Sequence, residues 1–171
     1  MLGGTDPSGG SAVAHAPGPG RLRAMAESQR WVRMTRRLMA PPGRVYRAWS
    51  DPEELARWLP DQVEGGLALG TRASLVWPDR RVWWEIVEAE APRRFAFRWP
   101  WLPDSRLVTT ATITISPAGY GTRLELQDGP FPIDEPGGLD AWAEALAGWS
   151  EALAQLRAHL DFSVDLRPRL L

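Results

Sequence analysis

Hydrophobic and polar residues alternate along several short stretches of this chain, and alternation with a period of two is the pattern of half-buried β-strands. The pattern predicts seven strands, at residues 30–39, 63–69, 72–77, 81–91, 93–99, 107–116 and 122–127. Turn signals such as Pro78-Asp79 and Ala91-Pro92 separate the last six. A succession of hairpins predicts an antiparallel sheet with one covered face.

Three helices are predicted from a different spacing of the apolar residues. Pro41-Pro42 ends the first strand and presets a short helix, and Asp51 is placed as the N-cap of a second, each of two to three turns. Helices this short are not stable alone in water, so they must pack on the sheet. Residues 139–160 carry an apolar stripe at intervals of three and four. A helix of that length spans about 33 Å, enough to cross a seven-stranded sheet.

The chain of 171 residues has the length of one domain and predicts an α+β fold. Residues 1–28 are rich in Gly, Pro, Ala and Ser without periodicity and are predicted to be disordered. The folded domain is placed at residues 29–161, and residues 162–171 are interpreted as a C-terminal tail.

Charge and residue inventory exclude several classes of function. With 20 basic and 21 acidic residues the chain lacks the basic excess of a nucleic-acid binder. No apolar run has the length of a membrane span and no signal peptide opens the chain, so no membrane partner and a cytoplasmic location are expected. Cysteine is absent and only His15 and His159 are present, so neither a metal nor a cofactor is expected. No nucleophile, phosphate-loop or dinucleotide motif appears, so no catalytic residue is predicted and a non-enzymatic role is favoured.

Ten tryptophans are more than a core of this size requires, since each indole can bury roughly 150–250 Å². They fill the core, or they form the aromatic wall of a cavity between the sheet and the long helix. Gly148, inside that helix, suggests a close backbone approach or a kink. Glu85 is predicted to face away from Glu88 and Glu90, with an ion-paired or solvated carboxylate as the alternative to burial. The candidate ligand-binding residues are Trp84, Phe97, Trp99, Trp142, Leu146, Trp149, Glu85 and Arg36, with Arg98 as a further polar group.

Four segments, taken in order, resemble the signature segments of the activator of heat-shock protein 90 ATPase family, within the START-like (SRPBCC) superfamily. They are VRMTRRLMAPPGRVYRAWSDPEELARWL, EAEAPRRFAFRW, ATITISPAGYGTRLEL and GWSEALAQLRAHL. The resemblance implies a helix-grip fold: a curved antiparallel sheet of six to seven strands around a long C-terminal helix, with two short helices after the first strand. It also implies a cavity between sheet and helix.

The resemblance leaves three functions open. The first is non-catalytic binding of a small hydrophobic or aromatic molecule in the cavity. The second is a protein-interaction module of the co-chaperone type, with a protein partner or a homodimer. The third is a cyclase- or hydrolase-like enzyme, which needs a buried acid or base in the cavity. The chain departs from the family at Trp58-Leu59, where relatives often have two tryptophans, and at Asp128, where many have a histidine after the last strand.

Overall fold

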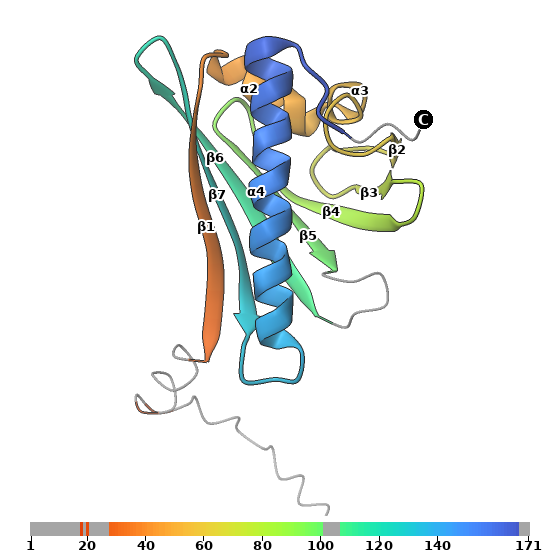
Figure 1. The fold of residues 1–171 in the computed structure, drawn as a ribbon, viewed down its shortest axis with the longest axis vertical. Helices are drawn as coiled ribbons and strands as arrows, with labels where there is room; N and C mark the ends of the chain where they lie inside the picture. The colour runs from red at the N-terminus through yellow and green to blue at the C-terminus, as the bar shows by residue number, and fades with distance from the viewer. Residues whose placement is uncertain (1–17, 19, 21–27, 101–106, 168–171) are drawn as a thin grey trace, which may run out of the picture.

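The computed structural model describes residues 18, 20, 28–100 and 107–167. The predicted disordered segment lies almost entirely outside these residues. Seven strands and three helices follow one another in the order β1, α2, α3, β2–β7 and α4 (Figure 1). Their bounds are β1 (Gln29–Leu38), α2 (Pro42–Ser50), α3 (Pro52–Leu55), β2 (Gln62–Gly65), β3 (Arg72–Val76), β4 (Arg81–Glu90), β5 (Arg94–Pro100), β6 (Val108–Ala118), β7 (Gly121–Pro132) and α4 (Gly138–Phe162).

The strands form one antiparallel sheet in the order β1-β7-β6-β5-β4-β3-β2. Six strands follow as a meander, and β1 joins the far end of that meander beside β7. The sheet curves around α4, which runs along one face, while α2 and α3 lie beside the C-terminal end of α4 (Figure 1). The predicted helix-grip fold is confirmed. Within the described residues no helix is long and apolar enough to cross a bilayer.

The core lies between the inner face of the sheet and α4. The predicted alternation gives β5, β6 and β7 one buried face each, with relative exposures of at most 2% for Phe95, Phe97, Ile113, Ile115 and Leu124. From the helix, the residues that meet them include Trp149, Leu153 and Leu156. The apolar residues on the inner face of the sheet and those in the stripe of α4 therefore pack together as one apolar layer.

The start of α4 requires glycine. A Cβ at Gly138 would lie 1.8 Å from the carbonyl oxygen of Pro132, so the turn after β7 brings backbone against backbone. This contact fixes where α4 leaves the sheet.

The short helices differ in part from the prediction. Asp51 accepts hydrogen bonds from the amides of Glu53 and Glu54, which confirms it as the N-cap of α3. However, α3 is a single turn rather than two to three. Two indoles attach this region to its surroundings: Trp58 donates to the carbonyl of Ala48 and Trp77 donates to that of Leu59. After α3 the chain continues in turns, in which the amides of Trp58 and Leu59 donate to the carbonyl of Leu55, and the two indole hydrogen bonds hold these turns in place.

Two strand boundaries were also wrong. The strand predicted at residues 63–69 ends at Gly65, where φ is +94° and the chain turns away. The last strand, predicted to stop at 127, continues to Pro132. Asp128, Gly129 and Pro130 form a turn-like sequence, yet Asp128 pairs with Ala111 of β6 and with Val32 of β1. Pairing on both sides holds this segment extended and places Asp128 in the strand rather than after it.

Candidate functional site: an aromatic groove beside the long helix

A groove opens between α4, the strands β4 and β5, and the turn after β3. Its volume is about 220 Å³. Four tryptophans contribute to it, from the turn after β3, from β4, from β5 and from α4. The lining residues are Leu59, Trp77, Arg80, Val82, Trp84, Trp99, Glu144, Ala145, Gly148, Trp149 and Ala152. We call this depression the aromatic groove.

The aromatic groove continues outward into a wider and more polar space of about 470 Å³. The two share Leu59, Trp77, Arg80, Gly148 and Ala152, so they form one continuous depression. The outer part adds Asp61, Pro78, Asp79, Glu151, Gln155 and Arg167. An apolar inner end and a charged mouth suit a molecule with an apolar body and a polar end.

Behind the groove, aromatic rings fill the space between sheet and helix. Trp84 stacks on Phe97 with ring centroids 3.6 Å apart and an interplanar angle of 13°. Trp49 lies 4.9 Å from Trp58, 6.4 Å from Trp84 and 6.2 Å from Trp149, centroid to centroid. These tryptophans therefore fill the core, as one of the two interpretations expects, and Trp84 and Trp149, which border the groove, are themselves only 2% and 5% exposed.

A buried carboxylate holds two of the groove indoles. Asp128 on β7 is fully buried, and its Oδ2 accepts a 2.8 Å hydrogen bond from Nε1 of Trp149. Its Oδ1 accepts a 3.3 Å bond from Nε1 of Trp99. One side chain thus connects β7 to β5 and to α4. Both indoles are fixed with their N–H groups directed away from the groove and toward Asp128.

The environment of Asp128 raises the pKa of its carboxyl group above the ordinary 3.8 because burial penalises the charged form. The indole of Trp149, the Thr109 hydroxyl, the indole of Trp99 and the amide of Gly129 act in the opposite direction and offset part of this effect. The Thr109 hydroxyl has no hydrogen bond of normal geometry, so we attribute its influence to proximity.

Asp128 is better placed to position other groups than to transfer protons. Each of its two oxygens faces an indole N–H, and it does not line the groove. A general acid or base must reach the atom that gains or loses the proton. The sequence-based reasoning missed this residue as a site candidate, although it noted Asp128 as a departure from the family. Asp128 is buried because β7 continues past residue 127. Gly129-Pro130 is a turn signal in the sequence, so the strand was predicted to end before Asp128.

The structure brings together three of the predicted site residues in the groove and places a fourth behind them. Trp84, Trp99 and Trp149 line the groove, and Phe97 supports Trp84 from behind. Trp142 instead donates a 3.3 Å hydrogen bond to the carbonyl of Trp31 on β1. Leu146 is half-buried and, like Trp142, is not among the lining residues.

The two charged candidates lie away from the groove. Arg36 is on β1, at the opposite edge of the sheet, and donates to the neighbouring carbonyl of Thr35 at 3.1 Å. Glu85 lies on the outer face of the sheet, with its side chain 38% exposed, between Arg72 and Arg98. Its carboxylate is 3.7 Å from Arg98 and 3.9 Å from Arg72. Arg98 therefore belongs to the outer face as well.

The orientation predicted for Glu85 relative to Glu88 was wrong. A bulge in β4 between Ile86 and Glu88 shifts the pairing with β5, so that Glu85 pairs with Arg98 and Glu88 with Ala96. The extra residue at position 87 reverses the alternation, which places Glu85 and Glu88 on the same face.

Gly148 does not mark a close backbone approach. A Cβ at this position would meet no atom within 4 Å, and the residue lines both parts of the groove. The absent side chain leaves space in the groove wall. This replaces the expected tight contact with an open position.

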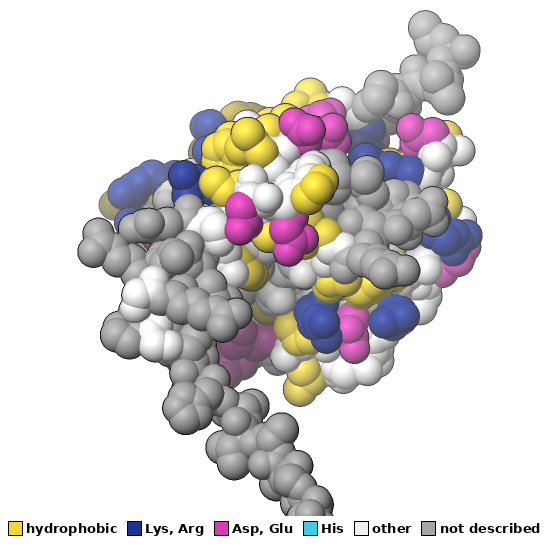
Figure 2. All heavy atoms as spheres, turned by 90° about the horizontal axis from the view of Figure 1, so that it is seen from below, with side chains coloured by type: hydrophobic (Ala, Val, Ile, Leu, Met, Phe, Trp, Pro, Cys, Tyr) yellow, Lys and Arg dark blue, Asp and Glu magenta, His cyan; other side chains and the backbone are white. Residues whose placement is uncertain are grey.

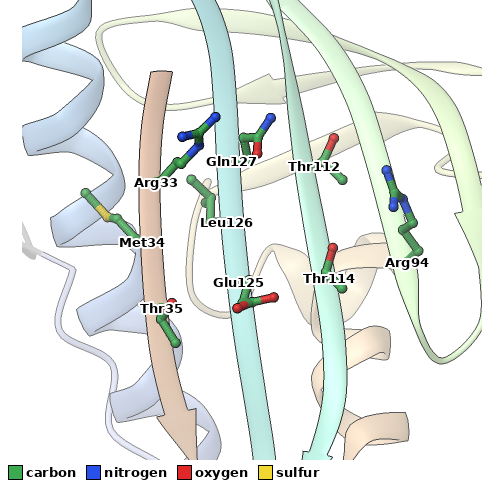
Figure 3. A pocket seen from close by; sticks show the side chains of 9 residues that line it. All are labelled: Arg33, Met34, Thr35, Arg94, Thr112, Thr114, Glu125, Leu126 and Gln127. Carbon is green, nitrogen blue, oxygen red and sulfur yellow. The ribbon is translucent and has the colours of Figure 1, made fainter. Parts of the chain in front are cut away.

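A second depression, of about 390 Å³, lies mainly on the outer face of the sheet. Figure 3 shows its lining side chains on four neighbouring strands, among them Arg33, Thr112, Thr114, Glu125 and Gln127. Most are polar, and Glu125 pairs with Arg123 there. Hydrophobic, acidic and basic side chains also mix on the end of the molecule seen in Figure 2. The second depression lacks the apolar, aromatic character of the groove, so the groove is the better candidate site. Across the described residues, no group of three His, Cys, Asp or Glu side chains could hold a metal.

Comparison with known proteins agrees with this architecture. The protein MLL2253 from Mesorhizobium loti is 24% identical with a TM-score of 0.69, covering 80% of this chain and 100% of its own. DynU16, from the dynemicin biosynthetic locus, is 23% identical with a TM-score of 0.68, covering 81% of this chain and 49% of its own. The Aha1 dimer from Colwellia psychrerythraea is 13% identical with a TM-score of 0.67, covering 78% of this chain and 97% of its own.

These likenesses to solved structures show the fold. None of the curated proteins compared with the chain matches it. The family model described as "Activator of Hsp90 ATPase homolog 1-like protein" matches residues 39–161, which include β2–β7, both short helices and nearly all of α4. The chain therefore belongs to the activator of Hsp90 ATPase homolog 1-like family.

Proposed function

We propose that this protein binds a small apolar or aromatic molecule in the aromatic groove, without catalysing its conversion. The observation that carries this proposal is the lining of one open groove by four indoles, Trp77, Trp84, Trp99 and Trp149. Removal of ligand surface from water is worth about 25 cal/mol per Å² of apolar area, and aromatic walls supply such area with defined geometry.

The volumes agree with a ligand of modest size. The inner part holds about 220 Å³ and the outer part about 470 Å³, within the range of small-molecule sites when taken together. DynU16, which shares the fold, comes from a biosynthetic locus. Both observations support a small molecule as the partner.

The neutral fluorescent probe N-phenyl-1-naphthylamine tests this function, because its emission rises in an apolar site. Trp99→Ala should weaken its binding severalfold, whereas Trp142→Ala should leave it unchanged. The two residues form a matched pair, since both are half-buried and each indole donates one hydrogen bond of 3.3 Å. Only Trp99 lines the groove. Equal loss in both variants, or no binding to the wild type, would count against the proposal.

Native mass spectrometry of the freshly purified protein adds an independent test. A discrete extra mass that disappears on denaturation would reveal a co-purified ligand and begin its identification. The same spectrum reports whether the protein is a monomer or a dimer, the latter being the state named for the Colwellia psychrerythraea relative.

A second function, binding to a chaperone, is favoured by exposed apolar side chains at the end of α4. Phe162, Val164 and Leu166 are 58%, 46% and 54% exposed, and Met39, 61% exposed, is joined to this end through the bond from its amide to Asp161. The family name refers to activation of the Hsp90 ATPase. We propose these residues as the contact. The test is Hsp90 ATPase activity with wild-type protein and with Phe162→Ser, which should lose any stimulation.

A further inference from the structure

The carboxylate of Asp128 has no cationic partner among the described residues. It is fully buried, and the hydrogen bonds it receives from side chains come from the neutral indoles of Trp99 and Trp149. Buried carboxylates in proteins are normally paired with a cation, because their desolvation is costly. Within the part of the chain that the structure describes, Asp128 is therefore held by hydrogen-bond donors and not by a balancing cation.

The same hydrogen bonds decide what the groove presents to a ligand. Because the N–H groups of Trp99 and Trp149 point to Asp128, neither is free to donate to a molecule in the groove. Trp77 also donates its N–H internally, to the carbonyl of Leu59. These three indoles therefore present ring carbon rather than a free donor to the groove, and aromatic rings carry negative electrostatic potential on their faces, which attracts cations. A carboxylate at the N–H edge of two of these rings adds to that potential.

The mouth of the groove adds further negative charge. Asp79 and Glu151 line the mouth and Glu144 lines the inner part, and none of the three has an ion pair among the described residues. Of the two basic residues, Arg167 is already bound to Asp165, with an Nη2–Oδ2 distance of 2.8 Å.

Arg80 is the other basic residue of the groove, and its guanidinium binds to the face of one groove indole. Its guanidinium lies over the ring of Trp77, 4.5 Å from the centroid. An aromatic face of this groove thus already holds a cation.

We propose that the aromatic groove is selective for an organic cation, meaning a flat apolar body that carries a protonated amine or a quaternary ammonium. In this proposal Asp128 acts as a specificity-determining positioning residue: it keeps two indole N–H groups away from the ligand and places negative charge behind the rings. The inference rests on the proposed binding function and adds the charge of the ligand to it.

Three naphthyl probes of one size test the sign of that charge: 2-(1-naphthyl)ethylamine, 2-(1-naphthyl)ethanol and 1-naphthylacetate. Titration calorimetry at neutral pH and low salt should rank them ammonium, alcohol, carboxylate. The ammonium should bind on the order of tenfold more tightly than the carboxylate, as expected for a cation on several aromatic faces. Asp128→Asn should reduce this ratio severalfold.

A matched set of variants separates the electrostatic effect from misfolding. The double variant Glu144→Gln/Glu151→Gln removes charge from exposed positions on α4 and should also reduce the ratio, even if Asp128→Asn does not fold. Glu125→Gln removes one charge on the outer face of the sheet and should leave the ratio unchanged.

The possible results distinguish the two proposals. If the neutral alcohol binds but the ammonium and carboxylate bind equally, or the carboxylate binds more tightly, the cation inference is overturned and the binding function stands. A carboxylate preference that disappears in Arg80→Gln would assign an anion to Arg80 instead. If none of the three probes binds, both proposals fail together.

Discussion

Trp149 on α4 donates its indole N–H to the carboxylate of Asp128 on β7 across 2.8 Å, inside the core. This contact joins the long helix to the strand that lies between β1 and β6. It also fixes the indole that forms one wall of the aromatic groove. Packing of the fold and shape of the candidate site therefore depend on the same pair of residues.

The raised pKa of Asp128 predicts a specific pH dependence of stability. Because this pKa is above the ordinary 3.8 in the folded protein, the folded state binds the proton more tightly than the unfolded chain. The resulting stabilisation is complete below the unfolded pKa and is lost as the pH rises through the folded pKa. In urea titrations, the free energy of unfolding of the wild type relative to Asp128→Asn should fall across that window. A difference that stays constant with pH would show that the pKa is not raised.

Replacement of Trp149 by Phe should cost more stability than the same change at Trp142. Trp149→Phe removes a donor to a buried carboxylate, which is worth about 1.5–3 kcal/mol, whereas Trp142→Phe removes a bond to a backbone carbonyl at a half-buried position, worth about 0.5–1.5 kcal/mol. Both changes delete the same atoms. Equal losses in chemical denaturation would indicate that only ring volume matters at these sites.

Gly148 offers a substitution that should stabilise the fold and block the groove at once. A Cβ there meets no atom within 4 Å, and Gly costs about 1 kcal/mol relative to Ala inside a helix. Gly148→Leu should raise the unfolding free energy while it weakens N-phenyl-1-naphthylamine binding, because the side chain enters the groove wall. Gly148→Ala is the control, with the gain in stability and a much smaller effect on binding. Unchanged probe affinity in Gly148→Leu would place the probe elsewhere.

Glu85 should prove irrelevant to the groove. Its carboxylate pairs with Arg72 and Arg98 on the outer face, at distances of 3.9 and 3.7 Å. Exposed pairs of this kind contribute about 0–1 kcal/mol. Glu85→Gln should therefore change the unfolding free energy by less than about 1 kcal/mol and leave probe binding as in the wild type. Weakened binding in this variant would contradict the assignment of Glu85 to the outer face.

The sequence by itself determined the elements and the face that each one buries. Alternation predicted a half-buried strand at 93–99, whose buried face holds Phe95 and Phe97. The stripe on residues 139–160 predicted a helix with one apolar face, which holds Trp149, and Asp51 was predicted as the N-cap of α3. These features depend on neighbours a few residues away, which periodicity and capping rules describe. The four family segments then indicated how the elements assemble.

Only the tertiary structure decided which side chains form the site. The bulge at position 87 moved Glu85 to the same face as Glu88, and the contact with β1 kept β7 extended through Asp128. Trp142 and Trp149 share a helix, yet one meets the carbonyl of Trp31 and the other meets Asp128. Such outcomes depend on register and on partners far away in sequence, and a shift of one residue exchanges the two faces of a strand. Local pattern determines that an indole is buried, but the position of the strand opposite determines what its N–H and its ring face meet.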